Sequence, residues 1–221
     1  MKKILLVLPI LLACLISSSA YGSGEVESEA IIQWNTLSIV TDPGVSIAWF
    51  NQQSFASAGS YPPHYYDQQA GWVNASAGTG NVKAYTNDDE LYALTRTSGP
   101  FLQSWAQRNA QFIVSGAGNI TFSVDYVVSN NILSYDPNFP SIGIWSAVYF
   151  QDDSARVDYP PFLFSESGTF VSSHYYADGQ EGRFTAMAIT EGYVGVPEAS
   201  TFALLCFSLV GLVGFRRKLT K

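Results

Sequence analysis

Alternating apolar and polar residues between Ile120 and Ser129 constrain the fold of this chain more than any other feature. Every second side chain of the stretch is apolar: Ile120, Phe122, Val124, Tyr126 and Val128. Thr121, Ser123, Asp125 and Ser129 stand between them, and Val127 is the one apolar residue on the polar side. A period of two predicts a β-strand with one buried face.

A flexible turn precedes this strand. Residues 115–119 read Ser-Gly-Ala-Gly-Asn, and Gln111–Val114 before them offers Phe112 and Val114 as inward residues of a second strand. Two strands joined by a short Gly-containing loop predict a β-hairpin.

Turn residues separate further short stretches with strand composition. We expect eight more strands at 36–41, 45–50, 71–76, 81–86, 142–150, 161–165, 169–174 and 183–190. Eight to ten short strands without a strong helical pattern predict an all-β class, as a single, jelly-roll-like β-sandwich. The sequence is compatible with either a helix or a strand at residues 87–96. Asn87 and Glu90 have the spacing of a helix capping box, whereas Leu91–Leu94 also suits a strand.

The N-terminus has the order of a secretory signal peptide. Lys2 and Lys3 precede an apolar stretch, and Ser18, Ser19 and Ala20 follow it. Residues 1–20 are therefore expected to be a signal peptide that exports the rest of the chain. A lipoprotein signal with Cys14 as the lipidated residue is the alternative.

The C-terminus holds a second apolar segment. Residues 201–215 carry no charge and are followed by Arg216, Arg217 and Lys218. As a helix the segment would reach about 22 Å, which is short for a bilayer core of about 30 Å, but flanking residues can extend it and the basic side chains can snorkel. We expect a single transmembrane helix with these cations in the cytoplasm as a stop-transfer signal. A buried helix of a soluble domain is the alternative.

Between these segments lies a body, residues 21–195, of a size that suits one domain. It contains no cysteine, so neither a disulfide nor a thiol-based metal site is available to it. It carries five Lys and Arg against seventeen Asp and Glu, a net charge of −12. Such an acidic surface disfavours nucleic acid as a partner.

The last 26 residues, 196–221, resemble a PEP-CTERM sorting signal. The resemblance rests on Pro197-Glu198-Ala199-Ser200, the apolar span and the basic end, paired with a signal peptide; Ala199 departs from the family's second proline. It implies that Pro197, Glu198 and Ala199 form a recognition and cleavage motif for exosortase, a membrane-embedded transpeptidase of Gram-negative bacteria that make exopolysaccharide. A plain single-span anchor is the alternative.

Two short segments of similar sequence, the His-Tyr-Tyr segments, contain the only histidines of the chain. His64-Tyr65-Tyr66 and His174-Tyr175-Tyr176 are each followed by an Asp one or two residues later. Tyrosine faces stack on sugar rings and polar neighbours bind hydroxyls, so these six residues are candidate carbohydrate-binding residues. Two unrelated, half-buried Tyr-rich loops are the alternative.

No catalytic motif is present in the body, so no catalytic residue and no enzyme activity are expected. No cofactor or metal site is expected either, although Asp88-Asp89-Glu90 and Asp152-Asp153 make calcium a candidate ion.

These patterns together predict an exported, non-enzymatic surface or extracellular-matrix protein. Its precursor is expected in the inner membrane with the body in the periplasm. Processing by exosortase is expected to place the product at the cell surface or in the matrix, in contact with the exopolysaccharide of a biofilm. A carbohydrate-binding or carbohydrate-active sandwich protein is the alternative.

Overall fold

The computed structural model describes residues 24–60, 65–99, 101–134, 142–151, 153–158 and 164–194. Every regular element in these ranges is a β-strand. The strands are β1 (Glu25–Thr41), β2 (Ser46–Gly59), β3 (Tyr65–Ala70), β4 (Ala75–Thr79), β5 (Val82–Thr86), β6 (Leu91–Thr97), β7 (Leu102–Ser115), β8 (Gly118–Ser134), β9 (Ile142–Phe150), β10 (Asp153–Asp158), β11 (Phe164–Tyr176) and β12 (Glu181–Val194). The predicted all-β class is confirmed.

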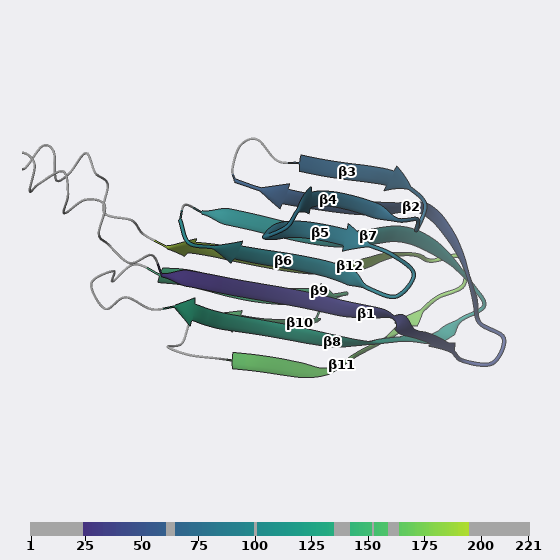
Figure 1. Ribbon diagram of the computed structural model, residues 1–221. Helices are drawn as coiled ribbons and strands as arrows, with labels where there is room; N and C mark the ends of the chain where they lie inside the picture. The colour runs from purple at the N-terminus through teal and green to yellow at the C-terminus, as the bar shows by residue number, and fades with distance from the viewer. Residues whose placement is uncertain are drawn as a thin grey trace, which may run out of the picture.

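The strands form two six-stranded antiparallel sheets that pack face to face (Figure 1). Sheet A has the order β11-β8-β1-β6-β5-β4, and sheet B has the order β10-β9-β12-β7-β2-β3. Consecutive strands pair only in β2–β3, β4–β5, β5–β6 and β9–β10, so the chain otherwise passes from one sheet to the other. This two-layer arrangement is a β-sandwich.

The core between the sheets has two parts of different composition. Aromatic side chains from both sheets, from the bulged segment of β1 and from the loop after β3 pack edge to face or at a tilt in one part, among them Trp34, Trp49, Trp72, Phe112, Phe122 and Phe184. Alanines and hydroxyl side chains fill the other part, where Thr190 contacts Thr95 at 2.9 Å and Ser104 at 2.8 Å. The inward residues expected on β7 and β8 are buried, except that Tyr126 is only half-buried.

The predicted hairpin between 111–114 and 120–128 is wrong. The turn at 116–117 carries the chain from sheet B to sheet A, so β7 and β8 lie in different sheets and their inward side chains meet in the core near this turn. The Phe112 and Phe122 rings consequently meet at 5.7 Å between centroids. Gly116 has a φ of 82°, and a Cβ there would lie 2.3 Å from the Gly44 carbonyl oxygen, so this close crossing requires glycine.

Residues 87–96, for which the sequence was compatible with either a helix or a strand, form a turn and most of strand β6. The Asn87 side chain does accept hydrogen bonds from the backbone N–H groups of Asp89 and Glu90, at 2.9 and 2.7 Å. These bonds close a turn between two strands, because Asn can satisfy the same N–H groups in a turn as at a helix start.

Other strand bounds were predicted less well. The expected strand at 142–150 is confirmed, whereas the one at 71–76 is mostly loop and β4 begins only at Ala75. The strands expected at 161–165 and 169–174 are one continuous strand, β11, in the part described. The strands are more numerous and several are longer than expected, with 17 residues each in β1 and β8.

The signal peptide and the C-terminal helix predicted from sequence lie outside the described residues. Within the described ranges, none of the elements is a helix with the length and apolarity needed to cross a bilayer.

Candidate functional site

The outer face of sheet B carries a row of near-parallel aromatic rings, the aromatic row, made of Tyr66, Phe55 and Trp105. Phe55 lies 6.1 Å from Tyr66 and 5.6 Å from Trp105 between ring centroids, with interplanar angles of 22° and 23°. The three residues come from the adjacent strands β3, β2 and β7. The Tyr66 ring is 69% exposed, so this end of the row is open to solvent.

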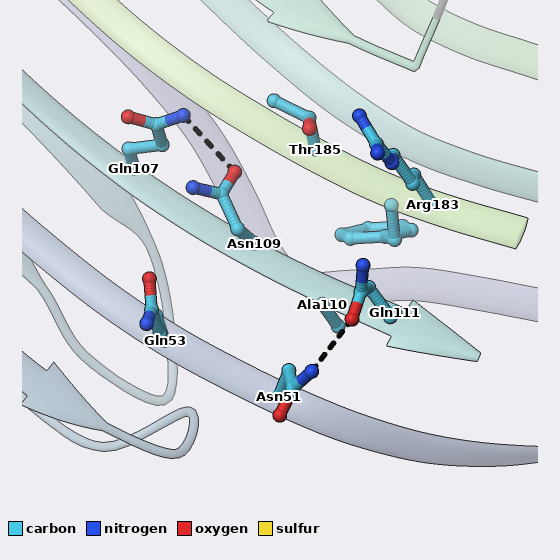
Figure 2. A pocket seen from close by; sticks show the side chains of 9 residues that line it. Asn51, Gln53, Gln107, Asn109, Ala110, Gln111, Arg183 and Thr185 are labelled. Carbon is cyan, nitrogen blue, oxygen red and sulfur yellow. Dashed lines mark hydrogen bonds between the residues drawn. The ribbon is translucent and has the colours of Figure 1, made fainter.

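Beside the aromatic row lies a groove of about 450 Å³ lined mainly by amide side chains (Figure 2). We name it the amide groove; its side-chain amides come from β2 and β7, and its far wall is β12. The lining residues are Asn51, Gln53, Gln107, Asn109, Ala110, Gln111, Arg183, Phe184 and Thr185. Its volume lies in the range of small-ligand sites.

Strand pairing explains why these side chains gather. Gln107, Asn109 and Gln111 occupy alternate positions of β7, so they share its outer face. Asn109 stands opposite Gln53 on β2 and opposite Thr185 on β12. Phe55 is the cross-strand partner of Gln107, which joins the aromatic row to the amide groove.

A β-bulge on β2 shapes one end of the groove. The β2–β7 register shifts between Phe50 and Gln53, and Asn51 there has a φ of 51°. Asn tolerates this left-handed conformation better than most residues. The Asn51 amide donates a hydrogen bond of 2.6 Å to the Gln111 side chain, and Figure 2 shows the two side chains pointing toward each other. A bulge beside a groove re-aims a side chain in this way.

The amide groove is polar but carries little charge. Arg183 is its one charged lining residue among those described, and none of these lining residues is Asp or Glu. Gln107 donates to the Asn109 side chain at 3.0 Å, and Trp72 donates from its indole N–H to the Asn109 carbonyl at 3.0 Å. These hydrogen bonds fix the amide side chains in place. Amides both donate and accept hydrogen bonds, so the groove can bind hydroxyl groups, which do the same.

The structure does not bring the two His-Tyr-Tyr segments together. Tyr65 and Tyr66 lie on β3 at an edge of sheet B, whereas His174, Tyr175 and Tyr176 lie on β11 at the opposite edge of the other sheet; His64 is outside the described residues. Only Tyr66 joins the aromatic row, because Tyr176 turns inward against Phe112. The described residues of both segments, Tyr65–Tyr66 and His174–Tyr176, therefore lie in strands and not in loops.

The side chains of the second His-Tyr-Tyr segment make local contacts. The His174 ring lies 2.9 Å from the Ser172 hydroxyl, and its centroid is 6.5 Å from that of Tyr176. Asp67, which follows the first His-Tyr-Tyr segment, accepts a hydrogen bond from the backbone N–H of Ser76 on β4. This bond connects the edges of the two sheets.

The acidic stretches do not form a metal centre within the described ranges. No group of three or more His, Cys, Asp or Glu side chains there is placed to hold a metal ion. Asp88, Asp89 and Glu90 belong to the turn before β6, and Glu90 accepts a hydrogen bond from the Tyr85 hydroxyl. Asp152 lies outside the described residues, so calcium binding remains a prediction.

Sequence reasoning missed the amide groove and two residues of the aromatic row. The amides at 107, 109 and 111 do alternate in the sequence, which was a usable signal. The contribution of Gln53 and Phe55 was not visible, because strand pairing alone places them beside β7.

The C-terminal segment lies outside the described residues, and comparison with known proteins identifies it. Residues 195–218 match the family described as the PEP-CTERM protein-sorting motif. The match includes Pro197, Glu198 and Ala199 and also Arg216, Arg217 and Lys218. No curated protein and no solved structure matches the chain at a significant level. The chain therefore carries a PEP-CTERM sorting motif, the mark of an exported protein that exosortase processes.

Proposed function

We propose that this protein is a non-enzymatic, polysaccharide-binding surface or matrix protein of a Gram-negative bacterium, delivered by exosortase. The sorting motif at 195–218 supports delivery to the outside of the cell, and its resemblance to signals of bacteria that make exopolysaccharide makes that polymer the candidate ligand. The precursor is held in the inner membrane by the C-terminal segment with its body, a jelly-roll-like sandwich, in the periplasm. Processing then places the body at the cell surface or in the biofilm matrix.

The observation that carries the binding proposal is the amide groove running beside the aromatic row on one flat sheet face. Aromatic rings contact the apolar faces of sugars, and amides bind the hydroxyl groups around their edges. The lining residues of the groove come from the adjacent strands β12, β7 and β2, so one polysaccharide segment can contact the groove and the aromatic row together.

The charge of the body narrows the class of polysaccharide. At a net charge of −12 it repels polyanions, so a neutral polysaccharide is the favoured ligand. Binding is also favoured over hydrolysis, since glycoside hydrolysis uses a pair of carboxylates and the described lining residues of the groove include none.

Affinity electrophoresis through gels containing a polysaccharide tests this function. We expect soluble neutral glucans to retard the processed protein and alginate, a uronate polymer, to have little effect. Tyr66→Ala and Gln107→Ala should each weaken binding by about 5- to 150-fold, since about 1–3 kcal/mol is the usual cost of losing a stacking contact or a buried polar partner.

Tyr175→Ala is the matched control for Tyr66→Ala. Tyr175 is exposed to a similar degree, 65% against 69%, but it lies on the outer face of the other sheet. Retardation that survives Tyr66→Ala and Gln107→Ala, or that is lost equally in Tyr175→Ala, would refute the assignment of this face.

A further inference from the structure

Strand β11 is a long, regular edge of sheet A. In the described part of the chain it pairs with β8 alone, from Phe164 opposite Asn130 to Tyr176 opposite Gly118, and the register has no shift along its 13 residues. Figure 1 shows it as the outermost strand of its sheet. An edge strand exposes a row of unpaired backbone N–H and C=O groups along its free side.

Most of the usual protections of an edge strand are missing from β11, in which Glu166 is the one Asp or Glu residue. The other edge strands β3, β4 and β10 are only five or six residues long. β11 contains no Lys, Arg or Pro and no bulge, and Val171 and Tyr175 on it are 60% and 65% exposed. Long, regular edges with few charges pair with a further strand unless something blocks them.

We propose that β11 pairs antiparallel with β11 of a second copy of this chain, which joins the two A sheets into one continuous sheet. A two-fold axis perpendicular to the sheet keeps each inner face on the same side, so residues of equal parity stand opposite each other. The one register that pairs all 13 residues has its centre at Phe170.

This register also matches side chains across the interface. It places Glu166 opposite His174 of the second copy, in both halves of the interface. It also sets Phe170 against its own counterpart and Phe164 opposite Tyr176 of the second copy. Aromatic cross-strand pairs stabilise a sheet, and a carboxylate can accept a hydrogen bond from an imidazole N–H, so the register with the most hydrogen bonds is also the one with matching side chains.

The outer face is equally compatible with this pairing. Ser167 stands opposite Ser173 of the second copy, and Thr169 stands opposite Val171 of the second copy. Small and β-branched side chains at these positions allow close approach without a buried charge. A second copy therefore fits this edge better than an unrelated strand, whose side chains would have to match it independently.

Light scattering of the full chain in detergent tests the proposal with one substitution and its control. Wild type should have twice the protein mass of Val171→Lys, because lysine on an edge strand blocks pairing. Val40→Lys is the matched control: Val40 is 61% exposed on the outer face of the same sheet, but on β1, an inner strand. It should leave the double mass unchanged, and both variants should keep a β-sheet circular dichroism spectrum.

Cysteine cross-linking tests the register itself, in a chain whose Cys14 and Cys206 are replaced by Ser. The pair Ser167→Cys and Ser173→Cys should form dimers through two disulfides on mild oxidation. The pair Ser165→Cys and Ser167→Cys lies on the same face of the same strand, but neither position meets a cysteine in this register, so it should stay monomeric.

Three results would overturn the proposal. Wild type could have the mass of a single chain throughout a dilution series, Val171→Lys could keep the double mass, or the control cysteine pair could cross-link as well as the test pair. Each would assign the free edge to another protein or to a segment of this chain beyond the described residues.

Discussion

Arg108 is a fully buried cation in the core, on the inner face of β7. It is 1% exposed, and its Nε and Nη2 atoms have no hydrogen-bond partner. Burial lowers the pKa of its guanidinium, although the charge of Asp88 acts in the opposite direction. The guanidinium carbon lies 4.6 Å from the centroid of the Trp34 ring, so a cation–π contact offsets part of the desolvation cost.

We expect Arg108→Met to increase the free energy of unfolding, by an amount on the order of the 1–4 kcal/mol gained at best when apolar side chains of similar volume replace a buried ion pair. Arg183→Met, on the outer face of sheet B, should change it little. Urea denaturation of both variants measures this. A loss of stability in Arg108→Met would show that the guanidinium has a stronger partner in solution than Trp34.

Two tyrosines on the outer face of sheet A are held in their neutral form. Burial is the main cause that raises the pKa of each hydroxyl. The next is a hydrogen bond, from Tyr85 to Glu90 and from Tyr92 to Glu29. The rings stack on each other at 4.9 Å, and the Lys83 ammonium lies 5.1 Å from the Tyr92 ring centroid.

The raised pKa values predict how stability depends on pH. An acid whose pKa is higher in the folded state contributes stability that is complete below its unfolded pKa, about 10 for tyrosine, and is lost as the pH rises further. Thermal unfolding should therefore occur at lower temperature as the pH rises above about 10. Tyr85→Phe with Tyr92→Phe should reduce this loss; an unchanged pH dependence would contradict the assignment to these two residues.

At the scale of the strands, three aromatic rings lie over glycines of neighbouring strands. Gly143 stands opposite Tyr193, Gly168 opposite Tyr126 and Gly182 opposite Phe112. A Cβ at each of these glycines would lie 1.9, 3.0 and 2.2 Å from the nearest atom of its partner side chain. Glycine leaves room for the partner ring, and the ring covers backbone that glycine would leave exposed.

Gly182→Ala should lower the free energy of unfolding by about 1–3 kcal/mol, the usual cost of overpacking. The new methyl group would displace the fully buried Phe112 ring. Gly99→Ala is the control, because a Cβ there meets no atom within 4 Å. Guanidinium denaturation gives both values. Equal stability of the two variants would mean that Phe112 has free space to move into.

Sequence predicted strands where large apolar residues alternate with polar ones, as in β8. The first half of β1 has the same period, with Glu25, Glu27 and Glu29 outward and Val26, Ser28 and Ala30 buried. It was missed because two of these inward residues are small or polar and give a weak apolar signal. The thin Ala- and Ser-rich part of the core needs such residues, and only the packing of the sheets shows this.

Pairing partners could not be read from the sequence at all. The turn at 116–117 is compatible with a hairpin or with a crossing between sheets, since both need glycine and both bury Phe112 and Phe122. Strand order also decides where the His-Tyr-Tyr segments lie, so their similar sequences did not reveal that they are on opposite edges. The amide groove was hidden in the same way, because its strands are far apart in the chain.

At the scale of the whole molecule, the faces of the sandwich have separate proposed uses. The outer face of sheet B presents the amide groove and aromatic row, and the β11 edge of sheet A presents an unblocked strand. A dimer through β11 would carry two polysaccharide-binding faces, and two linked sites bind a repeating polymer more tightly than one. Both uses require that the body reach the outside of the cell.

Mass spectrometry of the C-terminal peptide of the mature protein, from a host that has exosortase, tests that requirement most directly. We predict a chain ending near Pro197 or Glu198, and Pro197→Ala with Glu198→Ala should leave the precursor inserted but unprocessed. A host without exosortase is the control and should yield only the uncut precursor. A mature protein that still ends at Lys221 in the exosortase-bearing host would contradict sorting by this motif and leave a plain membrane anchor.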